Sequence, residues 1–156
     1  MDIGIVVVSQ TGHTESVAVK LKDKLAGSGH TVGYQKLQVK GEIRPDIKTY
    51  QYDELPDLTP YEAVVFASPV MAFSLNPAMK YYLSNIHSLA GKKAAFLVTE
   101  QFPFPWLGGN RAVRQMTQLC EVKGAQILDS VIVNWSNSRR EQQIEEGIDK
   151  LNDTMN

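Results

Sequence analysis

The chain has 156 residues, of which 43% are hydrophobic and 21% charged, and its formal net charge is −1. This size and composition predict one soluble globular domain over residues 1–156. The small net charge argues against nucleic acid or an anionic membrane as the main partner. A single cysteine, Cys120, excludes a disulfide within the chain and a cysteine-rich metal site. With no apolar stretch near the roughly 18 residues of a membrane span and no signal-peptide pattern, we expect a cytoplasmic protein.

Five segments carry the hydrophobic patterns of β-strands. Residues 3–8 and 63–68 are nearly continuous apolar runs, which is typical of strands buried on both faces of a sheet. Residues 31–39 alternate more between apolar and polar side chains and are expected nearer an edge of the sheet. Residues 93–99 and 125–133 are the remaining predicted strands.

Helical periodicity separates most of these strands. The apolar stripes are Val17, Leu21 and Leu25; Met79, Tyr82, Leu83 and Ile86; Val113, Met116 and Leu119 with Cys120; and Ile144, Ile148, Leu151 and Met155. Asn76-Pro77 is a typical helix start, with a capping residue before a first-turn proline. Ser138 and Glu141 have the spacing of a capping box and predict the start of the last helix.

The alternation predicts an α/β fold with a doubly wound, five-stranded parallel sheet covered on both faces. The segment between residues 39 and 61 is the exception, since it has three prolines and a poor helical pattern. Two parallel strands still need a crossover connection at this point. We therefore expect an irregular connection in place of the second helix.

The sequence SQTGHTES follows the first predicted strand and precedes the first predicted helix. Such a position offers unpaired N–H groups and a favourable dipole to an anion. Ser9, Thr11 and Thr14 add hydroxyls, and Gly12 lets the backbone curl so that consecutive amides converge. The loop has no Lys or Arg and lacks the Lys-Ser/Thr pair of a Walker A motif. It predicts a phosphate site, and the alternative is that Thr11 or Thr14 only caps the helix.

Two further loops follow the third and fourth strands and should share the same edge of the sheet. The loop at 99–110 has three aromatic residues, Phe102, Phe104 and Trp106, before the Gly108-Gly109 pair. Aromatic side chains on a ligand-side loop suit a flat ring. The alternative is a rigid loop folded over the core. Together the loops predict a ligand with one phosphate and one planar ring system.

SQTGHTES resembles the phosphate loop of flavodoxins, and PYEAVVFASPV resembles their third strand and the loop that follows it. The run from NPAMKYYL to the GG pair is similar to flavodoxin-like NAD(P)H:quinone oxidoreductases. The resemblance covers most of the chain and is weakest between residues 39 and 55. It implies strand order 2-1-3-4-5 and a noncovalent FMN at the switch point between strands 1 and 3.

The resemblance also implies which residues contact FMN. Residues of the first loop would take the phosphate, residues 69–73 would run along one edge of the isoalloxazine, and the loop at 99–109 would cover the other side. The cofactor-binding residues expected on this basis are Ser9, Gln10, Thr11, Gly12, His13, Thr14, Pro69, Val70, Met71, Ala72, Phe73, Thr99, Glu100, Gln101, Trp106, Gly108 and Gly109.

Three functions are open at this stage. The first is an FMN electron carrier that docks onto a redox protein, and the second is an FMN-dependent oxidoreductase that uses NAD(P)H and a small acceptor such as a quinone. In such enzymes a second subunit often completes the site, so a homodimer is possible. The third is a flavin-free interaction module, which the intact phosphate loop disfavours.

The loop after the third strand, residues 68–77, indicates whether one-electron or two-electron transfer is favoured. In flavodoxin-like carriers, the resemblance implies, a peptide in the loop after strand 3 turns its carbonyl toward the flavin. A Gly with positive φ makes this turn easiest. Residues 68–77 contain no Gly, and Met71, Ala72 or Phe73 would each lose about 1 kcal/mol in a left-handed conformation. This predicts a preference for two-electron transfer.

The remaining candidates are expected to be structural. Cys120 lies on the apolar face of its helix and is predicted to be a core residue rather than a redox thiol. His30 and His87 follow helix ends, where an imidazole can meet free carbonyls. Trp135 is expected to cover the core, with Arg139 and Arg140 solvated beside it.

Overall fold

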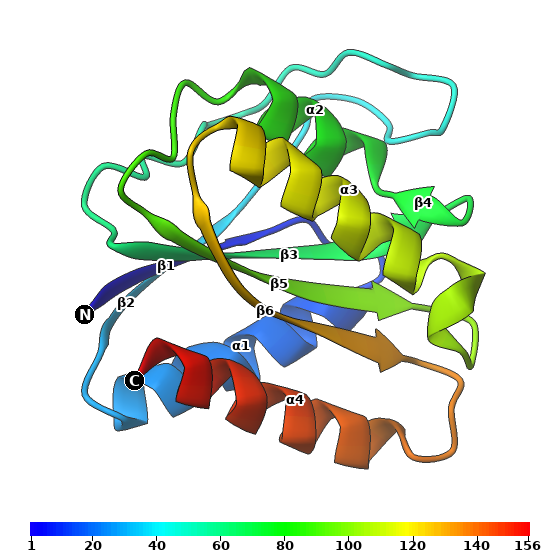
Figure 1. The fold of residues 1–156 in the computed structure, drawn as a ribbon. Coiled ribbons are helices and arrows are strands. Elements are labelled where there is room, and N and C mark those ends of the chain that lie inside the picture. The colour runs from blue at the N-terminus through cyan, green and yellow to red at the C-terminus, as the bar shows by residue number, and fades with distance from the viewer.

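The computed structural model describes residues 1–156 and is built around one sheet (Figure 1). Its strands are β1 (Asp2–Val7), β2 (Thr31–Lys36), β3 (Ala63–Met71), β4 (Ser74–Leu75), β5 (Lys93–Glu100) and β6 (Gln126–Asn134). The parallel strands are ordered β2-β1-β3-β5-β6, and the short β4 pairs antiparallel with the end of β3. The predicted five-stranded parallel sheet and its order are therefore confirmed, with β4 as an addition.

Helices cover both faces of the sheet. They are α1 (His13–Gly27), α2 (Pro77–Asn85), α3 (Gly109–Val122) and α4 (Arg140–Met155), with a short 3₁₀ helix η1 (Pro105–Leu107). α1 and α4 lie on one face, and α2 and α3 lie on the other (Figure 1). Each face has its own buried apolar cluster, one including Ile5 and Leu21 and the other including Phe66 and Phe96. None of the helices is long and apolar enough to cross a membrane.

The crossover from β2 to β3 has no helix, as predicted. Residues 37–62 run over the α2 side of the sheet as an extended excursion that contains one isolated antiparallel bridge, between Val39 and Tyr52. At its end, Tyr61 packs flat on β1 and β2, where Gly4 and Gly33 lie opposite each other. A Cβ at Gly4 would lie only 2.5 Å from the Tyr61 ring. The paired glycines therefore make room for the aromatic ring that covers the sheet here.

Of the two helix starts predicted from capping residues, one is confirmed and one is wrong. Asn76 caps α2 as predicted, since its Oδ1 accepts a hydrogen bond from the Ala78 N–H at 2.9 Å and Pro77 is the first helical residue. The predicted capping box of the last helix is wrong. α4 begins at Arg140 without a side-chain cap, because Asn137 forms a turn beforehand by accepting from the Arg139 N–H.

The loop after β3 also differs from the prediction. β3 continues to Met71 and turns back into β4 through Ala72 and Phe73, whose φ angles are 51° and 60°. The expectation that this loop avoids left-handed geometry is wrong, because a two-residue hairpin turn of this kind needs positive φ at both central residues. Without Gly or Asn, the turn carries a conformational cost of about 1–2 kcal/mol per residue.

Cys120 is fully buried on the inner face of α3, which confirms it as a core residue. Burial raises the pKa of its thiol to about 12. A thiol that stays protonated at neutral pH is a poor nucleophile.

Candidate functional site

Three loops meet at the edge of the sheet where the parallel strands end (Figure 1). Hydrogen bonds between side chains join them. The hydroxyls of Thr14, at the start of α1, and Thr99, near the end of β5, lie 2.7 Å apart and are buried. The Asn76 amide, which follows the β3–β4 hairpin, donates to Gln10 Oε1 at 3.2 Å. Gln10, Thr14 and Thr99 of the residues proposed from sequence are thereby linked across the loops, over up to 85 positions of the chain.

The loop between β1 and α1 presents unpaired donors. The Ser9 hydroxyl accepts hydrogen bonds from the N–H groups of Gly12 and Glu15. The N–H groups of Thr11, His13 and Thr14 have no acceptor within the chain. Gly12, at φ 88°, makes the turn that leads into the helix. Three free donors at the positive end of a 15-residue helix form a site suited to an anion.

The helix-capping alternative for the two threonines fails. The N-cap residue is Gly12, which has no side chain to cap the helix. The Ser9 hydroxyl accepts from the N–H groups of the first turn instead. Thr11 is exposed, whereas the Thr14 hydroxyl is turned inward to Thr99. Of the two hydroxyls, only that of Thr11 is free to contact a bound group without breaking a buried hydrogen bond.

Exposed aromatic side chains gather in the two loops that follow β3 and β5. Phe73, Phe102, Phe104 and Trp106 are 53%, 43%, 44% and 67% exposed. Phe73 stacks on Phe102 with ring centres 5.2 Å apart, and Phe104 stacks on Trp106 at 4.5 Å. The loop is therefore not simply folded over the core. A contiguous exposed apolar patch is a common mark of a binding surface.

The glycine pair in the loop after β5 allows close packing. Gly108 has φ 124°, and a Cβ there would lie 2.8 Å from Val70 and 2.9 Å from the Phe73 backbone. The loop thus rests directly on the β3–β4 hairpin. Gly108 and Gly109 are buried, while Pro69, Val70 and Met71 are half-buried and Gln101 is exposed.

Glu100 is directed away from the solvent. It is 3% exposed, and its carboxylate accepts hydrogen bonds from the Gly109 N–H at 2.9 Å and from the Asn134 amide. Burial raises the pKa of Glu100, and the two hydrogen bonds partly offset this effect. The carboxylate lies at the N-terminus of α3, so it fixes the end of the aromatic loop to that helix.

One part of this edge was missed from sequence. The His13 ring stacks on Trp135 with centres 4.0 Å apart, and the Arg140 guanidinium lies 4.7 Å from the Trp135 ring centre. Arg140 also donates to the Trp135 carbonyl at 3.0 Å and lies 3.4 Å from Glu141 Oε1, so it is only partly solvated, whereas Arg139 is exposed as expected. A cation therefore lies near the phosphate-like loop. The sequence could have indicated this, because Trp135 and Arg140 follow the last strand, which ends at the same edge of the sheet as the others.

Comparison with solved structures identifies the class of fold. No protein-family model and no curated protein sequence matches the chain. Oxidised flavodoxin 2 from Bacillus cereus superposes with a TM-score of 0.67 at 18% identity, covering 98% of this chain and 99% of that one. A cysteine-to-serine mutant of flavodoxin from Pseudomonas aeruginosa gives 0.70 at 14% identity, covering 99% and 98%. The chain has a flavodoxin-like fold.

The same arrangement occurs beyond the flavodoxins themselves. The Trp repressor binding protein from Bacillus subtilis superposes with a TM-score of 0.67 at 12% identity, covering 99% of both chains. In an open parallel sheet of the flavodoxin-like fold, a ligand binds outside the carboxyl ends of the strands, where the strand order reverses. Here that point lies between β1 and β3, and the loop with the free N–H groups begins at the end of β1.

Proposed function

We propose that the chain binds FMN noncovalently and transfers electrons through it. The observation that carries this proposal is the pairing of two features at one edge of the sheet. Three main-chain N–H groups of the β1–α1 loop have no acceptor, and four exposed aromatic side chains lie in the loops that follow β3 and β5 at the same edge. A phosphate suits the first feature and a planar ring system suits the second.

The chain offers separate groups for the two parts of FMN. The N–H groups of Thr11, His13 and Thr14, with the Thr11 hydroxyl, would hold the phosphate. The hairpin at 69–73 and the loop at 99–109 would contact the ring. When bound, FMN supplies the redox chemistry, and the protein supplies position and electrostatics.

Arg140 would supply the positive charge that the phosphate loop itself lacks. Its guanidinium packs on Trp135, which in turn stacks on His13 of the loop. Stacking on an aromatic ring holds a guanidinium in place at little entropic cost. The phosphate would therefore be bound by amide donors with a cation close by.

An electron carrier is favoured over an NAD(P)H-dependent reductase. The sequence argument for two-electron transfer assumed that the loop after β3 avoids positive φ. Ala72 and Phe73 both have positive φ, so that argument no longer applies.

A comparison of FMN with riboflavin, which lacks only the phosphate, tests the proposal. We expect FMN to bind at least about 100-fold more tightly in a flavin fluorescence titration, since two or more hydrogen bonds to a charged group are lost with riboflavin. Thr11→Ala should weaken FMN by about 1–3 kcal/mol. Thr49→Ala, an exposed threonine away from the site, is the control. Equal affinity for the two flavins would refute the phosphate site.

Two further variants separate the ring from the phosphate. Trp106→Ala should weaken FMN and riboflavin alike, because the side chain would contact only the ring. Arg140→Gln should weaken FMN several-fold and leave riboflavin unchanged. The neighbouring Arg139→Gln, whose guanidinium bonds Gln142 on the surface, is the matched control. A loss of riboflavin affinity in Arg140→Gln would assign Arg140 to folding of the loop instead.

A further inference from the structure

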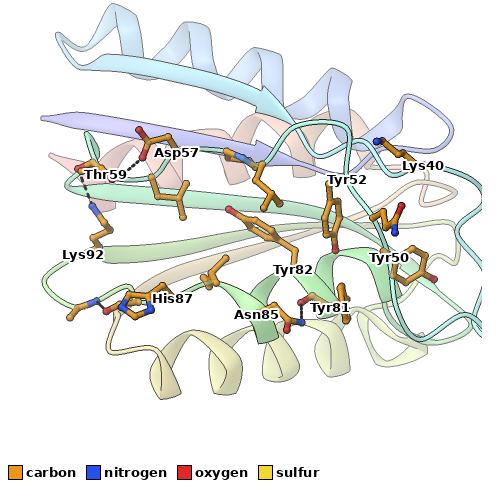
Figure 2. Close-up of a pocket in the computed structure, with 17 residues that line it drawn as sticks. Lys40, Tyr50, Tyr52, Asp57, Thr59, Tyr81, Tyr82, Asn85, His87 and Lys92 are labelled. Carbon is orange, nitrogen blue, oxygen red and sulfur yellow. Dashed lines mark hydrogen bonds between the residues drawn. The ribbon is translucent and has the colours of Figure 1, made fainter.

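A second cavity lies away from the three loops, on the α2 side of the molecule (Figure 2). It has a volume of about 940 Å³ and lies between the excursion at 50–59 and α2. Its walls include four tyrosines, Tyr50, Tyr52, Tyr81 and Tyr82, together with Leu58 and Ile86. No residue of the three loops at the carboxyl edge lines it. The cavity is within the size range of small-molecule sites, which are mostly lined by apolar and aromatic side chains.

One polar group in this cavity has no partner. The Tyr82 side chain, 3% exposed, points into the middle of the cavity, and its hydroxyl forms no hydrogen bond. By contrast, the Tyr52 hydroxyl donates to the Ala78 carbonyl at 2.8 Å, and that of Tyr50 lies within hydrogen-bond distance of two backbone carbonyls. A buried hydroxyl without a partner opposes folding, so its retention calls for an acceptor.

The charges around the cavity favour an anion. Lys40 and Lys92 line it together with one carboxylate, that of Asp57. Lys92 Nζ donates to the Tyr61 carbonyl at 2.6 Å, and Lys40 makes no ion pair. Two cations against one anion leave a net positive charge on the walls.

We propose that this cavity binds a planar aromatic carboxylate. The tyrosine rings would pack against its ring, the Tyr82 hydroxyl would donate to the carboxylate, and the net positive charge of the walls would favour the anion. This site is separate from the FMN site, and the proposal does not depend on FMN binding.

The probe is 2-naphthoate, titrated into the full-length chain by isothermal titration calorimetry with and without excess FMN. We expect one molecule to bind per chain with the same affinity in both conditions. The neutral analogue 2-naphthamide should bind at least several-fold more weakly. No binding at millimolar concentration, displacement by FMN, or equal affinity for the amide would each overturn the proposal.

Two matched variants locate the probe. Tyr82→Phe should weaken 2-naphthoate at least about tenfold, the loss expected for a hydrogen bond to a charged group, and should leave thermal stability unchanged or raised. The matched control is Tyr34→Phe on β2, which removes another buried hydroxyl without a hydrogen-bond partner, outside the cavity, so its affinity for 2-naphthoate should stay within about twofold of the wild type. Unchanged affinity in Tyr82→Phe would overturn the assignment of its hydroxyl to the ligand.

Discussion

The two crossovers before and after β2 are built differently. From β1 to β2 the chain passes through α1, whose inner face packs on the sheet through Val17, Leu21 and Leu25. From β2 to β3 it passes through the irregular excursion at 37–62, which rests on the sheet mainly through Leu37, Leu58 and Tyr61. The helical crossover begins with a row of free N–H groups, whereas the irregular one leaves a space against α2. The first arrangement suits an anion, and the second forms a cavity.

The largest difference should appear in folding stability. Leu21 of α1 is fully buried, and Leu55 of the excursion is 61% exposed. Leu21→Ala should lower the free energy of unfolding by about 2–5 kcal/mol, because it leaves a cavity in a packed core. Leu55→Ala should change it by no more than about 0.5 kcal/mol. Urea denaturation measures both, and a similar loss in the two variants would show that the excursion is as tightly packed as α1.

The contact between the excursion and the sheet depends on the paired glycines. Gly4→Ala should destabilise the protein by about 1–3 kcal/mol, since the new methyl group would overlap the Tyr61 ring. Gly27→Ala, at the end of α1 with open space around it, should be neutral or stabilising by up to about 1 kcal/mol. Thermal denaturation should therefore give a lower melting temperature for Gly4→Ala than for Gly27→Ala. A melting temperature of Gly4→Ala equal to or above that of Gly27→Ala would show that Tyr61 does not pack on Gly4.

An Ala→Gly substitution should stabilise the β3–β4 hairpin, although the same substitution destabilises a helix. Ala72 has φ 51°, so Ala72→Gly should relieve strain and raise the free energy of unfolding by about 0.5–1 kcal/mol. Ala26→Gly, at an exposed position within α1, should lower it by about 0.5–1 kcal/mol. If both variants are destabilised equally, Ala72 does not adopt the left-handed conformation in solution.

The smallest effect concerns the pH dependence of stability. Because the pKa of Glu100 is raised in the folded protein above its ordinary value of 4.5, folding favours its protonated form. The stability it contributes is present below that ordinary value and is lost as the pH rises through the folded-state pKa. Glu100→Gln lacks this titration, so the stability of the wild type relative to the variant should decline with rising pH above 4.5. A constant difference in chemical denaturation across that range would argue against the raised pKa.

The regular parts of the fold could be predicted from the sequence, because hydrophobic periodicity directly reflects burial. The continuous apolar run of β1 was predicted for this reason, whereas the start of α2 was predicted from the capping residue Asn76 before Pro77. Ser138 has the spacing of a capping residue, but Asn137 forms the turn before α4. Local patterns cannot decide between two neighbouring side chains that compete for the same role.

The candidate site was predictable only in part. The phosphate-like loop lies within one stretch of sequence, so its donors could be anticipated. The stack of His13, Trp135 and Arg140 joins segments more than 120 positions apart, which only the folded chain brings together. The positive φ of Ala72 and Phe73 was also unpredictable, because hairpin pairing of β3 with β4 overrides the local preference of both residues.

The most direct test of the central claim is a ¹H–¹⁵N correlation NMR titration with FMN and, separately, with riboflavin. FMN should shift the amide resonances of Thr11, His13 and Thr14 strongly, because these N–H groups would gain a phosphate acceptor. Riboflavin should leave them nearly unmoved, and neither flavin should shift Leu58 or Tyr82 of the second cavity. Shifts confined to the second cavity, or a β1–α1 loop that does not respond to FMN, would contradict the account.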